Sequence, residues 1–193
     1  MKNNKTEILI CDTLLVMMES KPYYSIKVTD LIKKANISRS TFYVYFDSIS
    51  DVLQKIHDDF LGAFPEETDV SSLARSKFKC NEIRVDEREM EGYLYLKSNM
   101  KTYRILSGPN GDPSFYIRLR NRVTRITSSV LSEELKSIPT TNKQIIATFF
   151  AGGKIAVNDW WACHESNISM DEIACITSNL YAKMLNFILK DWK

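Results

Sequence analysis

The chain has few of the residues that interrupt helices and few of those that build enzyme sites. Its 193 residues include only 6 glycines, 5 prolines and 2 histidines. The apolar positions recur at the three- and four-residue spacing of helices, and strand-like alternation is scarce. With two histidines, no nucleophile elbow and no paired acids in a recognisable frame, the sequence does not support catalysis. We therefore expect an all-α protein that is not an enzyme.

The cysteines and the apolar runs exclude further classes. The four cysteines have no CxxC spacing, which favours free thiols in a reducing compartment. Cys163 and His164 are adjacent and would point about 100° apart on a helix, so we expect no metal site and no other cofactor. No run of about 18 apolar residues occurs, so no membrane span is expected. Glu7 and Asp12 interrupt the apolar run near the first residue, which argues against a secretory signal and favours a cytoplasmic location.

Residues 21–46 concentrate positive charge in a chain that is nearly neutral. The whole chain has 26 basic and 24 acidic residues, a formal charge of +2. This segment has five basic residues against one acid, Asp30, which gives +4 locally. Lysine and arginine neutralise DNA phosphates and release counterions, so the segment is a candidate DNA-binding surface. For Lys33 and Lys34, a purely solvated surface position is an equal alternative.

The same segment has the pattern of a helix-turn-helix. Thr29 is the expected N-cap of a helix over 30–35, Asn36 suits a left-handed turn residue, and Ser38 is the expected N-cap of a helix over 39–45. The second helix of such a motif enters the major groove. We expect DNA contacts from basic, hydroxyl and phenol side chains: Lys27, Thr29, Ser38, Arg39, Ser40, Thr41, Tyr43 and Tyr45.

The aromatic residues of the second helix divide between two faces. Phe42 and Phe46 are four residues apart, and we expect both in the core. Tyr43 lies on a different face of the helix, which makes it the better candidate for a phosphate contact.

These residues resemble the DNA-binding domain of the tetracycline-repressor (TetR) family of transcriptional regulators. The resemblance extends over Glu7 to Leu53, and its order and spacing are carried by Thr29, Ala35, Ser38, Thr41-Phe42-Tyr43 and Tyr45-Phe46. It implies an all-helical homodimer that binds double-stranded operator DNA, and we expect a repressor. It also implies an N-terminal three-helix DNA-binding domain, taken as residues 1–48, and a C-terminal ligand-binding and dimerisation domain, residues 49–193.

Two positions depart from the family pattern. The family usually has a phosphate-binding lysine three residues after the phenylalanine that ends the recognition helix, but here that residue is Ile49. Asn36 also stands where the family favours glycine. We therefore include Lys55 among the expected DNA contacts, as a displaced phosphate anchor. A chain that has lost DNA binding is the alternative raised by Ile49.

The C-terminal half resembles the subtype named after dihydroxyacetone-kinase regulators, over Tyr103 to Lys183. Two segments carry this resemblance: LSGPNGDPSFYIRLRNRV and FFAGGKIAVNDWW. The glycines of SGPNGDPS lack the GxxxxGK[ST] phosphate-loop pattern, so we expect a helix connector there. Aromatic residues are expected to line a cavity for an unidentified small-molecule effector, with ordinary core packing as the alternative for each: Tyr93, Tyr103, Phe115, Tyr116, Phe150 and Trp160.

Two long helices are expected at the end of the chain, over 142–164 and 170–191, with Ser169 as N-cap of the second. In the TetR family such helices pair with those of a second subunit. Two adjacent glycines inside the first helix each cost about 1 kcal/mol relative to alanine. Close approach of a partner helix would compensate, and room for a ligand is the alternative. The expected dimer interface is Ile145, Phe149, Gly152, Gly153, Ile176, Leu180 and Met184. A second hypothesis is that this surface binds a protein partner, which would make the chain a co-regulator or activator.

Overall fold

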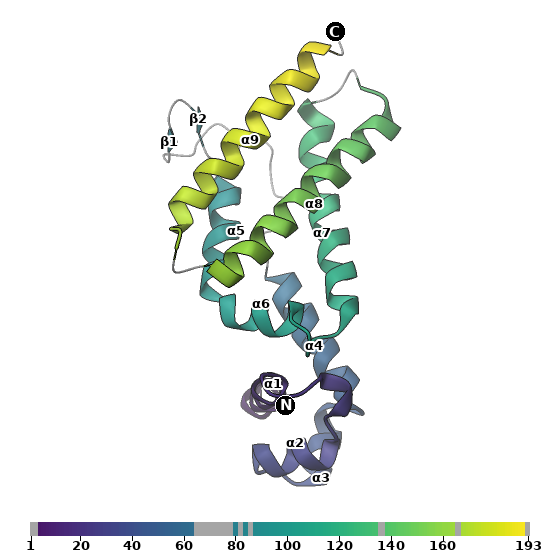
Figure 1. Ribbon diagram of the computed structural model, residues 1–193. Coiled ribbons are helices and arrows are strands. Elements are labelled where there is room, and N and C mark those ends of the chain that lie inside the picture. Colours follow the sequence, from purple (N-terminus) through teal and green to yellow (C-terminus); the bar gives the residue numbers. More distant parts are fainter. Residues whose placement is uncertain are drawn as a thin grey trace. The chain divides into compact units, whose positions relative to one another are not determined.

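The computed structural model describes residues 4–63, 79–80, 83–84, 87–134, 138–164 and 167–191. In these ranges the regular secondary structure is helical except for one short antiparallel strand pair, which confirms the all-α fold class (Figure 1). In chain order the elements are α1 (Asn4–Met18), the 3-10 helix η1 (Tyr23–Ser25), α2 (Val28–Ala35), α3 (Arg39–Tyr45), α4 (Ile49–Gly62), β1 (Lys79–Cys80), β2 (Ile83–Arg84), α5 (Glu87–Ser98), α6 (Met100–Ser107), α7 (Pro113–Glu134), α8 (Thr140–His164) and α9 (Met170–Asp191).

The chain divides into two compact units. Unit 1 comprises residues 1–63 and 101–116, and unit 2 comprises residues 64–100 and 117–193. Unit 1 therefore contains the expected DNA-binding segment 1–48 together with α4 and most of α6. A functional boundary at residue 48 stays a prediction, but the compact unit extends beyond it.

The core of unit 1 forms around α1, which packs against α2 and α4. Ile10 and Leu14 are completely buried on one side of α1, at the spacing of one helical turn. Leu31 of α2 is also completely buried, and Leu53 of α4 is 2% exposed. Truncating any of these side chains to alanine would cost about 2–5 kcal/mol, so this core holds the helices of unit 1 together.

A second part of that core is aromatic. The ring of Phe60 lies 6.2 Å from Tyr103 and 5.6 Å from Phe115, and the imidazole of His57 lies 5.2 Å from Phe115. All four side chains are at most 4% exposed. Aromatic pairs at these centroid separations add to the stability that burial provides. His57 is thus a core residue of unit 1.

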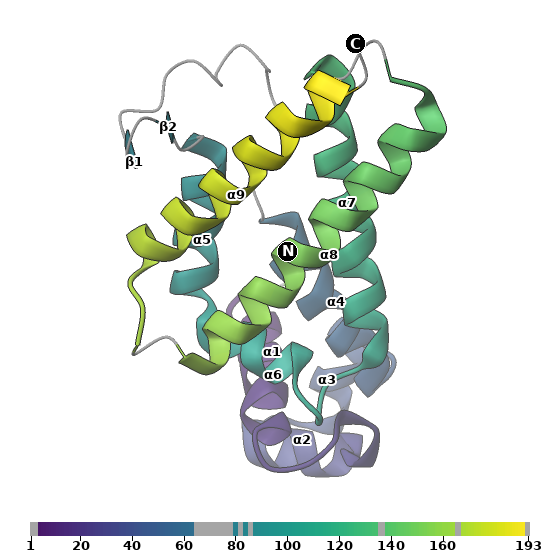
Figure 2. The ribbon, with the colours of Figure 1, turned by 45° about the horizontal axis from the view of Figure 1, so that its top comes forward.

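Unit 2 contains the long helices. Figures 1 and 2 both show α5 beside α9 and α7 beside α8. Tyr93 of α5 packs edge-to-face on Trp161 of α8 at 5.8 Å, and its hydroxyl lies 3.0 Å from Thr177 Oγ1 of α9. A second cluster buries Leu131, Ile146 and Leu185, with Phe150, Tyr181 and Ile188 packed against it.

Helix α9 begins with a capping box, as expected for Ser169. The backbone N–H of Ser169 donates to Glu172 Oε2 at 2.9 Å, and the N–H of Glu172 donates to Ser169 Oγ at 3.2 Å. Hydrogen bonds from the Ser169 side chain and backbone lower the pKa of Glu172, because they favour the carboxylate. The sequence signal at this helix start was therefore sufficient.

The turn between α6 and α7 is built around close backbone approaches. A Cβ at Gly111 would overlap the backbone carbonyl of Leu106, and one at Gly108 would lie 2.5 Å from the Arg104 carbonyl oxygen. Asp112 caps α7, since its Oδ1 accepts the N–H of Ser114 at 3.0 Å. The turn places Asn110 against the end of α1 and the start of η1. The expectation of a helix connector here is thus correct.

The thiols differ from the expectation in one case. Cys11 and Cys163 are free, as expected, whereas Cys175 is disulfide-bonded.

In the described part of the chain, no helix is both long and apolar enough to cross a membrane.

Candidate nucleic-acid interface

Helix α3 is short, and its first residues are fixed by hydroxyl groups. Ser38 Oγ accepts the backbone N–H of Thr41 at 2.9 Å, which caps the helix as expected. The same oxygen lies 2.8 Å from Ser40 Oγ and 2.7 Å from Thr41 Oγ1. Phe42 is fully buried and Phe46 is 7% exposed, which confirms the predicted core face. These two rings anchor α3 in the core, and the side chain of Ser38 caps the helix.

The turn before α3 also follows the prediction. Asn36 has φ 53° and ψ 46°, in the left-handed region, and asparagine tolerates this conformation better than most residues. The predicted start of α2 is wrong, however. The helix begins at Val28, and Lys27 is its N-cap residue, without a side-chain cap. Thr29 is consequently an exposed residue of the first turn rather than the cap.

The exposed face of α3 consists of two pairs, each spaced by one helical turn. Arg39 and Tyr43 form the first pair: the guanidinium carbon lies 5.6 Å from the centre of the Tyr43 ring. Ser40 and Val44 form the second pair, and both are exposed. Thr41 and Tyr45 are only half-buried. Charged, hydroxyl, phenol and aliphatic groups thus share one accessible surface.

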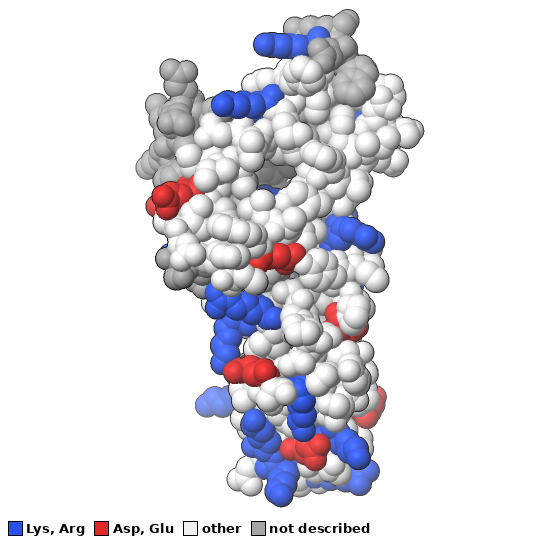
Figure 3. All heavy atoms as spheres, viewed as in Figure 1, with Lys and Arg blue, Asp and Glu red and all other residues white. Residues whose placement is uncertain are grey.

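Basic side chains surround this face. Lys21 lies 3.7 Å from Asp30, the only acid of residues 21–46, and neutralises it. Four cations of this fully described segment are exposed and form no ion pair: Lys27, Lys33, Lys34 and Arg39. Figure 3 shows Lys and Arg atoms gathered at the end of unit 1 formed by α2 and α3. Such a surface favours a polyanion.

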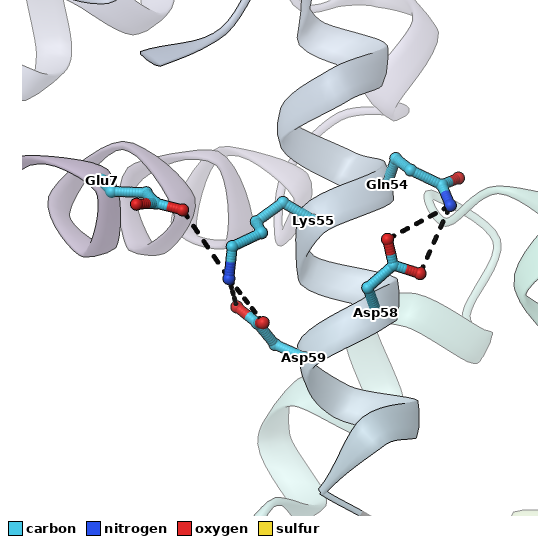
Figure 4. A network of polar contacts seen from close by, with 5 residues as sticks. All are labelled: Glu7, Gln54, Lys55, Asp58 and Asp59. Carbon is cyan, nitrogen blue, oxygen red and sulfur yellow. Dashed lines mark hydrogen bonds and ion pairs between the residues drawn. The ribbon is translucent and has the colours of Figure 1, made fainter. Parts of the chain in front are cut away.

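Lys55 does not belong to this surface. Its ammonium lies 2.5 Å from Asp59 Oδ1 on α4 and 3.7 Å from Glu7 Oε1 on α1 (Figure 4). The hydrogen bond to Asp59 is the main reason that the pKa of Lys55 is raised. Because two carboxylates already neutralise Lys55, the geometry argues against a displaced phosphate anchor. Lys55 instead joins α4 to α1.

Ile49 is part of the core rather than of the charged surface. It is 9% exposed, at the first position of α4. Ser48 caps this helix by accepting the N–H of Asp51 at 3.2 Å. A buried aliphatic residue thus stands where the family pattern has an exposed phosphate-binding lysine.

The six aromatic residues expected to line a ligand cavity are divided between the two compact units. Tyr103, Phe115 and Tyr116 belong to unit 1, whereas the other three belong to unit 2. Tyr103 and Phe115 are buried core residues, and Tyr116 is 37% exposed. In unit 2, Tyr93 packs on Trp161, Phe150 packs on Tyr181 at 4.5 Å, and Trp160 is 48% exposed.

The expected dimer residues all lie on exposed faces of α8 and α9. Ile145 and Phe149 are each 64% exposed, Ile176 is 52% exposed and Leu180 is 56% exposed. Met184 is also exposed, at 37%. A Cβ at Gly152 or Gly153 would meet nothing within 4 Å in this single chain. Each helix therefore has one apolar face in its own core and a second one exposed.

Metal ligands do not gather in the described part of the chain, where no group of three His, Cys, Asp or Glu side chains could hold an ion. The ring of His164 stacks on that of Trp160 at 4.5 Å, and its Nδ1 lies 2.7 Å from the Trp160 carbonyl oxygen. Cys163 is exposed beside it.

Sequence reasoning missed two residues that bear on this surface. Val44 is 57% exposed on α3, and its four-residue spacing from Ser40 was a readable signal. Asn110 holds the end of α1, from which it is 92 residues away, and no local pattern could reveal that contact.

Comparison with known proteins identifies the C-terminal half. Residues 93–183 match the family described as Transcriptional regulator C-terminal region, TetR_C_8. No curated protein sequence matches the chain.

Several solved structures have the same fold. "Dihydroxyacetone kinase operon activator DhaS" is 19% identical with a TM-score of 0.66, over 96% of this chain and 98% of that one. A TetR transcriptional regulator from Streptococcus agalactiae 2603V is 20% identical with a TM-score of 0.65, over 92% and 93%. A protein from Syntrophomonas wolfei str. Goettingen, described as a TetR-family transcriptional regulator, is 18% identical with a TM-score of 0.67, over 95% and 96%.

The matched family and these structural neighbours are transcriptional regulators, not enzymes. The match assigns residues 93–183 to the TetR_C_8 family of transcriptional-regulator C-terminal regions, and the chain as a whole shares the all-α fold of the solved TetR-family regulators.

Proposed function

We propose that this regulator binds a palindromic operator as a homodimer, represses transcription, and is released by a small molecule bound in unit 2. The exposed face of α3 carries the DNA-binding part of this proposal. Arg39 and Tyr43 present a cation and a phenol, which suit guanine edges and phosphates. Four exposed cations without ion pairs to the described residues supply the sequence-independent attraction, and the one acid of residues 21–46, Asp30, is paired with Lys21.

The second apolar faces of α8 and α9 support the homodimer. Apolar residues recur along α8 at Ile145 and Phe149, and along α9 at Ile176, Leu180 and Phe187, all more than half exposed. Monomeric proteins rarely expose such continuous apolar surface. Gly152 and Gly153 lie in the same region, where the missing side chains let another helix approach closely. A second copy satisfies both features, because a symmetric dimer uses the same patch twice.

A buried polar group supports an effector in unit 2. Asn158 of α8 is 6% exposed, and its Oδ1 accepts no hydrogen bond from the part of the chain that the structure describes. A buried acceptor without a donor costs about 1–3 kcal/mol. Trp161, three residues further on the same helix, packs on Tyr93 of α5. A flat molecule with a hydrogen-bond donor suits this combination of an amide oxygen and aromatic rings.

Release would follow from a change in subunit arrangement. Two recognition helices can occupy successive major grooves only when they are about 34–36 Å apart. An effector that binds more tightly to another arrangement lowers operator affinity by that difference in binding free energy.

A second candidate is an activator that binds a protein partner instead of a small molecule. One structural neighbour is named as an operon activator. The exposed Trp160 and Phe149 also give α8 an aromatic surface, which suits protein contacts.

Selection of genomic DNA fragments by the purified protein tests the proposal, at about 100 mM salt because phosphate-driven affinity falls steeply with salt. The proposal predicts one palindromic site with half-sites about one helical turn apart, and no selection by an Arg39→Ala/Tyr43→Ala variant. A promoter reporter that carries this site then decides between repression and activation. Selection of no fragment above background would contradict DNA binding.

A further inference from the structure

Val44 is the exposed aliphatic residue of the helix-turn-helix. Its side chain is 57% exposed on α3. The other large aliphatic side chains of residues 21–49 are buried or half-buried, including Ile26, Leu31 and Ile49. Valine is also a weaker helix former than alanine, because its branched Cβ restricts rotation in a helix. Neither the fold of unit 1 nor the stability of α3 therefore accounts for this side chain.

The surroundings of Val44 suit a duplex. Ser40 lies one turn earlier on the same face of α3, and Arg39 and Tyr43 form the adjacent face. The exposed cations described above give the segment the charge complement of a phosphate backbone. In the major groove, the apolar group that distinguishes one base from the others is the 5-methyl group of thymine.

We infer that Val44 reads a thymine methyl group in each operator half-site, and that it is a specificity-determining residue of this regulator. The inference rests on the proposed operator binding and adds the base that this position selects. The isopropyl group packs on the methyl group and excludes water from it, so T·A is preferred over base pairs without that group. Arg39 and Tyr43 supply attraction and orientation, while Val44 supplies an apolar contact.

The test removes the methyl group from the DNA and the isopropyl group from the protein. Each thymine of the selected operator is replaced in turn by deoxyuridine, which keeps base pairing and lacks only the 5-methyl group. Binding of each duplex is measured for the wild type, Val44→Ala and Val16→Ala. Val16 is the matched control, because it is a helical valine of unit 1 with 44% exposure, on α1 instead of α3.

The wild type should bind one symmetric pair of deoxyuridine duplexes about fourfold less tightly per half-site, the effect of losing one methyl-sized apolar contact. Val44→Ala should bind the thymine and deoxyuridine forms equally, and Val16→Ala should behave as the wild type does. Circular dichroism checks that Val44→Ala keeps its helices, as expected for a substitution to a better helix former.

Two results would overturn the inference while the proposed function stands. In the first, the wild type binds its operator but no thymine replacement weakens binding. In the second, the replacement penalty persists unchanged in Val44→Ala. If the wild type selects no operator at all, the proposed function itself fails, and that outcome is seen before any deoxyuridine duplex is made.

Discussion

Asn110 in the α6–α7 turn donates a hydrogen bond from Nδ2 to the carbonyl oxygen of Met18, at 2.9 Å. The carbonyl oxygen of Asn110 in turn accepts the backbone N–H of Tyr23 at 3.0 Å. One residue of the turn thus satisfies the end of α1 and the start of η1. Both contacts lie within unit 1, just before the helix-turn-helix.

Asn110→Ala removes the hydrogen bond to Met18 and leaves the backbone bond to Tyr23. We expect the free energy of unfolding to fall by about 1–2 kcal/mol, because a carbonyl at the end of α1 loses its donor. Urea unfolding measures this change. Asn121→Ala is the control, since Asn121 is an exposed residue of α7. Equal stability of the two variants would show that the side-chain contact contributes nothing.

Gly111→Ala tests the close packing of the same turn. A Cβ there would overlap the Leu106 backbone carbonyl, so the turn must shift, and we expect a loss of about 1–3 kcal/mol in unfolding free energy. Gly62→Ala is the matched control, because a Cβ at Gly62 meets nothing within 4 Å. Gly62 ends helix α4, where alanine is expected to stabilise by up to about 1 kcal/mol. Thermal unfolding of both variants should therefore show shifts of opposite sign.

The contrast between Asn110 and α3 shows what the sequence could reveal. The bounds of α3 and α9 were predictable, because Ser38 and Ser169 give local capping signals. Thr29 was misjudged because it suits a cap chemically, yet α2 begins one residue before it. Tertiary context decided that boundary.

The side-chain contacts of Lys55 show what could not be predicted from the sequence. Its ion pair with Glu7 joins residues far apart in the sequence, so charge alone could not separate a phosphate anchor from a structural cation. The six aromatic residues assigned to one cavity were likewise indistinguishable by type, and the fold distributes them between two units. Local sequence signals were enough to predict helices and caps but not the tertiary contacts of individual side chains.

The exposed apolar faces of α8 and α9 predict a dimer that a charged substitution would dissociate. Phe149→Glu or Leu180→Glu places a carboxylate on a surface that the proposed interface desolvates, and this costs several kcal/mol unless the charge is paired. Size-exclusion chromatography with light scattering should then give a monomer. Leu94→Glu, at a leucine of α5 with 49% exposure, should leave the dimer intact. Dimers of all three variants would place the interface elsewhere.

The two free cysteines should differ in reactivity. Burial raises the pKa of the Cys11 thiol to about 12, because desolvation disfavours the thiolate, whereas Cys163 is exposed. Since the thiolate is the reacting form, iodoacetamide near neutral pH should label Cys163 and spare Cys11 in the folded protein. Mass spectrometry of the peptides measures this.

The raised pKa of Cys11 also makes the stability of the fold depend on pH. The folded pKa is raised, so the stability from the neutral, half-buried thiol is present below about pH 9 and is lost as the pH rises toward about 12. Once the protein is unfolded in urea, iodoacetamide should label Cys11 at neutral pH. Rapid labelling of Cys11 in the native protein would contradict its burial.

The salt dependence of operator binding by the wild type, Arg39→Ala and Arg120→Ala tests the DNA-binding role of α3 most directly. Arg120 is an exposed arginine of α7 in unit 2 and serves as the control. The logarithm of the binding constant falls with the logarithm of salt concentration by about 0.9 for each phosphate neutralised. Arg39→Ala should weaken binding at least tenfold and, if Arg39 contacts a phosphate, reduce this slope by about 1 per subunit, whereas Arg120→Ala should match the wild type. Equal affinities and slopes for all three proteins would contradict the assignment of α3 as the DNA-binding element.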